Sequence, residues 1–426
     1  MQGVPPEDER SARNTAFLPR LKRQGVVTAE ICLFFLVGLQ VFFNPFPQVT
    51  AVHEFGFYGS VILLVFLVAT GKTTINLRTP LSIPLGLFLL WTLVGLPFAM
   101  NKGNSLHDIY AHLIKYIVLF YLIAHTCATP KRFHILTWLV TLSTALFSFG
   151  ITIHYYLILG KGLNERLGLV SYSEMPTNII AVLTVFAAIV SAGHIVTART
   201  GCRKAIASFF LILFAVTTLA TGSKGALIAI VVGLLCFFAS DRKKLLVFLA
   251  AILLIAGVLY SMNYFAPMAQ RLKEDPRIGV WYNFYEMAKD HPVVGIGFGM
   301  QTYDDDALVR KYNERVPSRF RAEEPIRAPH NLLVSVAVRT GFPGLVLFLA
   351  VIVAFLRLAL RTRNRPGEGF DPNWGRCILA AFIALLIQGM LENTASGPPA
   401  VLMFTLFAMA TILRGKEDGS LTPQPL

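Results

Sequence analysis

The sequence predicts an all-α polytopic membrane protein with about 12 transmembrane helices. Of its 426 residues, 55% are hydrophobic and 15% are charged, and the mean hydropathy is +0.60. Ordinary soluble domains carry roughly 25% charged residues. A soluble chain of this length would need a charged surface around two or three cores, and this composition does not supply one.

Twelve apolar runs support this fold class, because a helix of about 20 mostly apolar residues crosses the hydrocarbon. Pro80, Pro176 and Pro398 stand at the starts of runs, where a missing N–H group costs little. In the tenth run, Gly341 and Gly344 predict a division into a short helix and a longer one. The predicted spans are 26–43, 55–71, 80–99, 108–127, 133–159, 176–197, 204–221, 224–240, 245–263, 332–356, 376–394 and 398–413.

The cations of the connections predict that both chain ends face the cytoplasm. In this orientation the inner connections and the two ends hold 22 Lys and Arg residues, whereas the short outer connections hold four. Positive charge is enriched on the cytoplasmic side of membrane proteins. Eight acidic residues share the inner side, so this face alone accounts for the formal net charge of +14. Such charge indicates insertion and contact with anionic membrane lipids, and not nucleic-acid binding.

One connection, residues 264–331 between helices 9 and 10, is much longer than the others and holds ten basic and ten acidic residues. We expect it to form a small, partly helical cap outside the cytoplasm. Trp281, Phe284, Tyr285 and Ala288 are spaced to share one face of a helix there. The predicted parts are a cytoplasmic N-terminal segment (1–25), helices 1 to 9 (26–263), this loop (264–331), helices 10 to 12 (332–413) and a cytoplasmic tail (414–426).

Several apparent motifs are weak. The five cysteines show no CxxC spacing, so neither a disulfide framework nor a zinc site is predicted. The acidic run Asp304–Asp306 has the ligand type for a divalent cation, but a solvated loop or helix cap is the favoured interpretation. The glycine-rich stretch 295–299 lacks the strand–helix context of a phosphate loop and is interpreted as a turn.

A few cations are predicted at the outer edge of the membrane, although Lys and Arg are usually enriched on the cytoplasmic side. A charge within a span costs several kcal/mol unless it is paired or wetted. Guanidinium groups bind phosphate in a fork and lysine binds it as a point charge, so cations around one cavity would suit a lipid-linked diphosphate. Taken singly, each is more often a snorkelling or ion-paired side chain. The four candidates are Arg166, Lys224, Arg277 and Arg339.

Three segments resemble the motifs of a known family. His330 and Asn331, followed after nine residues by Gly341-Phe342-Pro343-Gly344, are similar to the H[NSQ]-x9-GxxG signature of the O-antigen ligase and polymerase superfamily. The stretch "TGSKGALIA" at 221–229 resembles its S-R-G-A element at the head of a membrane helix. The stretch 275–299 resembles its R…W…P-x-x-G-x-G segment. The similarity extends from about residue 160 to residue 345.

The resemblance implies a GT-C-like membrane glycosyltransferase of the inner membrane of a Gram-negative bacterium, with the long loop and active site in the periplasm. In O-antigen ligases a glycan moves from undecaprenyl diphosphate to a sugar hydroxyl of lipid A–core oligosaccharide, without a cofactor or metal. His330 matches the catalytic histidine and Arg277 the loop arginine of the family. Lys224 stands where the family usually has arginine. Asn331, Gly341 and Gly344 match supporting positions.

The chemistry agrees with this interpretation. Outside the cytoplasm there is no ATP, so the donor's sugar–diphosphate bond must supply the energy. The leaving diphosphate needs fixed positive charge in a low-dielectric pocket. The imidazole of His330 is suited to take the proton of the attacking hydroxyl, with Asn331 or a loop carboxylate orienting the ring. Attack opposite to the leaving group inverts the anomeric centre.

Two alternatives stay open. An O-antigen or exopolysaccharide polymerase, or a protein O-oligosaccharyltransferase, would share the superfamily's motifs and use another acceptor. A lipid or sugar transporter is the more remote alternative, because its charges should lie near mid-bilayer on broken helices of two related halves. Here the charges gather at one face of the predicted membrane domain.

Overall fold

The computed structural model of the chain describes residues 27–162, 165–167, 175–266, 276–324, 326–364 and 367–415. All regular secondary structure within these ranges is helical. Eight of the described helices are long and apolar enough to cross a membrane, and four shorter apolar helices fall on the remaining predicted spans. The all-α polytopic membrane class is therefore confirmed, and the number of twelve spans stays a prediction. The N-terminal segment 1–25, nearly all of the tail 414–426 and residues 267–275 of the long loop lie outside the described residues.

The apolar helices begin and end within a few residues of most of the predicted spans. The side chains of Thr129, Thr200 and Asp241 cap three of their starts by accepting backbone N–H groups. The helices are Val27–Phe42, α2 (Thr50–Ala69), α3 (Ser82–Gly95), α4 (Lys102–Ile109), α5 (Lys115–Thr126), α6 (Pro130–Ile153), α7 (Thr177–Thr197), α8 (Gly201–Thr221), α9 (Lys224–Phe238), α10 (Arg242–Ser261), α14 (Leu332–Asn364), α15 (Asn373–Gly389) and α16 (Gly397–Arg414).

Two of the long helices contain a π-helical turn. The turn Tyr110–Ile114 joins α4 to α5 without a break, and His154–Ile158 ends α6. The predicted fourth span, 108–127, is therefore extended toward its N-terminus, where the side chain of Asn101 accepts the Asn104 N–H and starts α4. The added residues at the start of α4 are mostly polar, so this part of the helix lies outside the apolar span.

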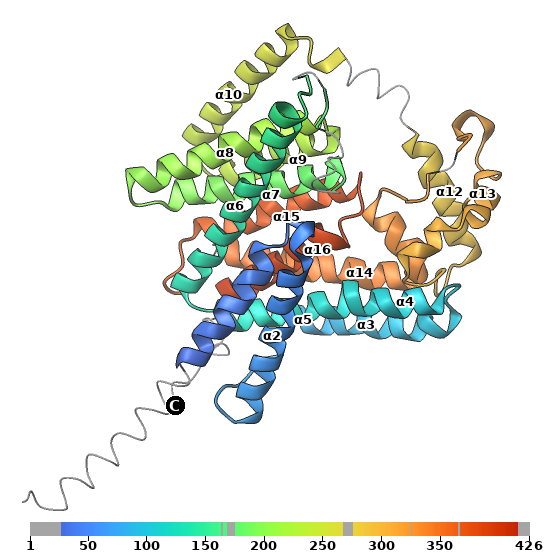
Figure 1. Cartoon of the computed structure of the whole chain (residues 1–426), viewed down its shortest axis with the longest axis horizontal. Coiled ribbons are helices and arrows are strands. Elements are labelled where there is room, and N and C mark those ends of the chain that lie inside the picture. Colours follow the sequence, from blue (N-terminus) through green and yellow to red (C-terminus); the bar gives the residue numbers. More distant parts are fainter. Residues whose placement is uncertain are drawn as a thin grey trace, which may run out of the picture.

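The helices of the second half of the chain form the centre of the bundle. α7 packs against α8, α9 and α15, while α14 packs against α3, α15 and α16. Figure 1 shows α14 to α16 lying between the N-terminal helices and the group α6 to α9. In the apolar 18-residue stretches of α7 and α16, 83% of the residues are buried, whereas in that of α10 none is. α10 therefore stands at the periphery, where its apolar surface is available to lipid.

The segment before α14 folds as a small helical unit that packs beside the first part of that helix (Figure 1). It contains α12 (Arg277–Asp290), a 3₁₀ turn (Met300–Asp304) and α13 (Asp306–Asn313). We call residues 276–331 the cap. Its small core includes Val280, Phe284 and Met287 of α12, together with Val338 of α14. Of the four residues predicted to share one face of this helix, Phe284 and Ala288 are buried, whereas Tyr285 is 52% exposed.

A backbone break in α14 holds the cap against the membrane bundle. Gly341 has φ 70°, a left-handed conformation that interrupts the helix as predicted from its two glycines. A Cβ atom at this position would lie 2.0 Å from the Val293 carbonyl oxygen. The Phe342 N–H donates to the Pro292 carbonyl at 2.8 Å. The cap therefore crosses α14 at a point where only glycine leaves enough room.

Substituting Gly341 with alanine should destabilise the protein by at least ~2 kcal/mol, because the methyl group overlaps a backbone carbonyl and φ is positive. Gly86→Ala is the matched control, since a Cβ there meets nothing within 4 Å. Thermal unfolding of both variants in detergent measures the difference. Equal melting temperatures for the two variants would contradict this account of the crossing.

Candidate active site

His330 lies directly before α14 in an unusual backbone conformation. Its φ is +42°, and non-glycine residues adopt positive φ rarely and often at functional sites. Its Nδ1 atom is 2.9 Å from Oε1 of Glu392, a residue of the connection between α15 and α16. The side chain of His330 is 34% exposed and that of Glu392 is 14% exposed. The pair therefore joins a largely buried carboxylate to an imidazole that solvent still reaches.

Glu392 is held by further hydrogen bonds. The Asn178 side chain of α7 donates to Oε2 at 2.9 Å, and the Asn393 backbone donates to Oε1 at 3.1 Å. Burial acts to raise the pKa of the Glu392 carboxyl, but the bond and charge of His330 and the Asn178 amide lower it further. The net pKa is below the ordinary value of 4.5, so the group is a carboxylate at neutral pH.

Asn331 fixes the position of this pair without touching the ring in any described contact. Its side-chain oxygen accepts the N–H groups of Leu333 and Val334 at 2.9 and 3.1 Å, which caps α14. Its amide donates to the Met390 carbonyl at 3.0 Å. Of the two predicted partners of the imidazole, a carboxylate makes the contact. It comes from the α15–α16 connection and not from the long loop.

Arg166 joins the same network from another segment. Its guanidinium donates to Oδ1 of Asn178 at 3.0 Å and to the Thr221 carbonyl at the end of α8 at 2.5 Å. The neighbouring Glu165 pairs with Lys161 at 3.8 Å. Arg166 is thus one amide away from Glu392, so the structure brings it to the His330 region.

A narrow cavity places Arg277 beside this network. Arg277, Ser223 and Gly225 line it together with Asn178 and Glu392. Arg277 is the first residue of α12 and Lys224 the first of α9. Both helices therefore begin at this cavity, and helix N-termini attract anions through unpaired N–H groups and the helix dipole. Cationic side chains and helix starts together make this region suitable for a phosphate-bearing ligand.

Arg339 is not brought to this cavity. It is 3% exposed, donates from Nε and a terminal nitrogen to the Phe298 carbonyl, and lies 3.9 Å from the centroid of the Phe298 ring. It lines a different, mainly apolar cavity together with His112. Arg339 was predicted to lie with the other cations because it follows His330 on the same span. In the structure its position on α14 places it in the protein interior.

The acidic run of the cap is accounted for by local structure. The Asp305 side chain accepts the Ala307 and Leu308 N–H groups and caps α13, in line with the predicted helix cap. Asp306 pairs with Arg327 at 2.9 Å. Among the described residues, no group of three or more histidine, cysteine, aspartate or glutamate side chains is arranged to hold a metal ion.

The fold and site define a membrane-embedded helical protein with a histidine–carboxylate pair beside a cationic cavity. Residues 209–349 match the family model described as O-antigen ligase, and this confirms the predicted superfamily resemblance over that range. The matched range is similar to a family of membrane glycosyltransferase-like proteins. It includes Lys224, Arg277 and His330, while Arg166 and Glu392 lie outside it. No curated protein matches the chain.

Sequence reasoning missed Glu392 and Asn178. The run 376–394 was assigned as a span, which put Glu392 inside the membrane. An acidic residue within a span is itself a signal, because such groups are costly and usually have a partner or a function. α15 ends at Gly389, so Glu392 lies in the connection that follows. Asn178 gave no comparable signal, since a polar residue in the first turn of a helix is ordinary.

Glu392→Gln should lower the melting temperature at about pH 7, because the neutral amide cannot replace the charge-assisted bond to His330. A lowered carboxyl pKa stabilises the fold above the ordinary value of 4.5, and this contribution is lost as the pH falls through the lowered value. The difference between wild type and variant should therefore narrow below about pH 4.5. Melting curves from about pH 7 to about pH 4 measure it.

The exposed Glu323→Gln is the matched control for this series, and it should melt like the wild type throughout. A Glu392→Gln difference that stays constant down to about pH 4 would show that the carboxylate charge does not stabilise the site.

Proposed function

We propose that this chain is an O-antigen ligase, which transfers a glycan from undecaprenyl diphosphate to a sugar hydroxyl of lipid A–core oligosaccharide. The main observation that supports it is the 2.9 Å contact between His330 Nδ1 and Glu392 beside a cavity lined by Arg277. In this proposal His330 is the general base, Glu392 is its positioning residue, and the transfer needs no metal.

The proton step follows from the hydrogen bond to the ring. When Nδ1–H donates to a carboxylate, the neutral imidazole has its lone pair on Nε2, which can then accept a proton. The acceptor sugar's hydroxyl loses its proton to Nε2 as its oxygen bonds to the anomeric carbon. The imidazolium formed is stabilised by Glu392, whose low pKa keeps it charged throughout.

The leaving group needs positive charge more than a proton. As the bond from the anomeric carbon to the diphosphate oxygen breaks, the electron pair and negative charge pass to the diphosphate. Arg277, Lys224 and Arg166, with the starts of α9 and α12, provide fixed positive charge near the cavity. The base and the leaving group act on opposite sides of the sugar, so the configuration inverts. We leave Arg339 out of this group because its guanidinium is buried against Phe298.

The proposed setting is the inner membrane of a Gram-negative bacterium, with both termini in the cytoplasm and the cap and His330 in the periplasm. The distribution of cations among the connections supports this orientation. A polymerase or a protein O-oligosaccharyltransferase of the same superfamily is the second candidate, since the motifs do not distinguish the acceptors. A strain without this protein separates them: a ligase defect leaves full-length glycan on its carrier, and a polymerase defect leaves short glycan.

His330→Ala should reduce glycan transfer by at least ~100-fold, because the attacking hydroxyl loses its proton acceptor. The assay uses purified protein, a glycan on undecaprenyl diphosphate and lipid A–core, with the product resolved by gel mobility. His107→Ala is the control, since this histidine is 70% exposed on α4, and its transfer should stay within about twofold of wild type. Full activity of the His330 variant would refute the general-base role.

Arg277→Ala should cost at least about tenfold in transfer, the loss of one charge-assisted contact with the diphosphate. The transfer rate of Arg277→Lys should lie between those of Arg277→Ala and wild type, because lysine keeps the charge and loses the fork geometry. Arg310→Ala, at an exposed arginine of the same cap, is the control and should be close to wild type. Initial rates against donor concentration measure the series. Equal rates for Arg277→Ala and Arg310→Ala would show that Arg277 does not bind the donor.

A further inference from the structure

An open hollow lies between the start of α4 and the cap, apart from the cavity at His330. Its volume is ≈ 480 Å³, which is in the range of a ligand pocket. Two segments almost 200 residues apart in the sequence form it, so it exists only in the folded protein. The lining residues are Met100, Asn101, Lys102, Gln301, Thr302, Asp305 and Leu308.

The walls of the hollow combine hydrogen-bonding groups with apolar surface. Amide groups, the Lys102 ammonium and the Asp305 carboxylate supply donors and acceptors, while Met100 and Leu308 supply apolar contact. A sugar unit has the matching character, with hydroxyl groups at its rim and C–H groups on its faces. A phosphate dianion would meet one cation beside a carboxylate, which gives little net attraction. The walls therefore favour neutral sugars over anions.

One wall residue has an unsatisfied hydroxyl group. Thr302 is 5% exposed, and its Oγ1 atom has no hydrogen-bond partner among the described residues. A buried hydroxyl without a partner costs about 1–3 kcal/mol. The oxygen itself is closed off from solvent, so Thr302 lines the hollow through its other atoms.

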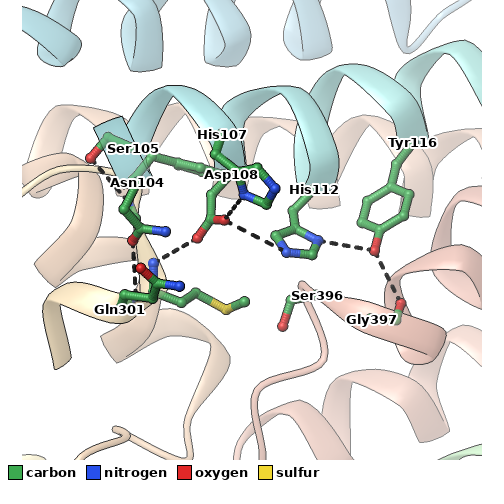
Figure 2. A network of polar contacts seen from close by, with 12 residues as sticks. Asn104, Ser105, His107, Asp108, His112, Tyr116, Gln301, Ser396 and Gly397 are labelled. Carbon is green, nitrogen blue, oxygen red and sulfur yellow. Dashed lines mark hydrogen bonds and ion pairs between the residues drawn. The ribbon is translucent and has the colours of Figure 1, made fainter. Parts of the chain in front are cut away.

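The cap side of the hollow is fastened to α4 before any ligand binds. Asn104 accepts the Gln301 N–H at 2.9 Å (Figure 2), and Asp108 accepts the Met300 N–H at 2.7 Å. Ser105 accepts a third backbone N–H of the same segment at 3.2 Å. A wall that is already ordered reduces the entropy lost on binding.

A short chain of contacts connects the hollow to the catalytic pair. Met300, directly before Gln301, accepts the side-chain amide of Asn393 at 3.9 Å through its sulfur. The Asn393 N–H donates to the same Glu392 oxygen that contacts His330. A glycan whose reacting sugar lies at His330 extends beyond it, and contacts with its remote sugar units add to the affinity for the substrate.

We propose that this hollow binds neutral sugar units of a glycan substrate at a distance from the reacting bond. The inference rests on the proposed function, which makes glycans the substrates. The sugars belong either to the donor glycan or to the acceptor oligosaccharide, and the hollow's chemistry suits both.

The test measures binding by the full chain in lipid nanodiscs to two probes. One is phosphate-free core oligosaccharide, and the other is a soluble oligosaccharide of O-antigen repeat units released from its carrier. Gln301→Trp places an indole in the hollow, and Gln301→Ala removes the amide while keeping the backbone bond to Asn104. Glu323→Trp, at an exposed cap residue, is the matched control.

Wild type and the Glu323 variant should bind one of the probes, and Gln301→Trp should weaken that affinity by at least about tenfold. Gln301→Ala should weaken it by about threefold or more, and it decides the question if the tryptophan variant does not fold. Binding of the core oligosaccharide assigns the hollow to the acceptor, and binding of the repeat units assigns it to the donor. Failure of wild type to bind either probe, or unchanged affinity in both Gln301 variants, would overturn the proposal.

Transfer kinetics separate this inference from the proposed function. In Gln301→Trp the KM for the substrate whose sugars occupy the hollow should rise by about tenfold, with little change in kcat. A wild-type chain that binds the probe at the hollow and transfers no glycan would refute the proposed function but not the sugar-binding site. Normal transfer by Gln301→Trp with both KM values unchanged would refute the sugar-binding site but not the proposed function.

Discussion

The hydrogen bond between the His330 imidazole and the Glu392 carboxylate is the contact on which the rest of the site depends. The two residues are 62 positions apart, in connections at the start of α14 and the end of α15. A buried carboxylate in a membrane protein is costly unless its oxygens are paired. Its donors come from the cap, from α7 and from its own connection. Satisfying one charge therefore brings together parts of the chain that the membrane helices alone would leave apart.

The same pairing resolves an electrostatic conflict. A carboxylate beside a diphosphate would repel it, yet Glu392 lines the cavity that Arg277 also lines. Its hydrogen bonds with His330 and Asn178 offset part of that negative charge. The starts of α9 and α12 each add roughly half a positive charge. The cavity keeps an attraction for anions while the imidazole keeps the partner that orients it.

Much of the membrane architecture could be predicted from the sequence, because apolar length is a local property that each helix carries by itself. His330, Lys224 and Arg277 could also be singled out as candidate site residues, since charged and titratable groups stand out in an apolar chain and match a known signature. The partner of His330 could not be predicted. Whether Glu392 lies inside a span depends on where α15 ends, and its contact with Asn178 depends on how α7 packs. The exposure of Tyr285 could not be predicted either, because it depends on which residues of α12 pack against the rest of the cap.

Arg339 has a structural role, although it lies on the helix that directly follows His330. A guanidinium that binds a diphosphate must be reachable from the cavity, whereas this one is 3% exposed and bonded to the Phe298 carbonyl. Phe298 belongs to the segment that follows α12, which crosses α14 at the Gly341 break. Arg339 and Gly341 therefore fasten the cap to the helix that begins at His330. Arg277 is on the cap and His330 precedes α14, so this crossing sets the distance between these two side chains.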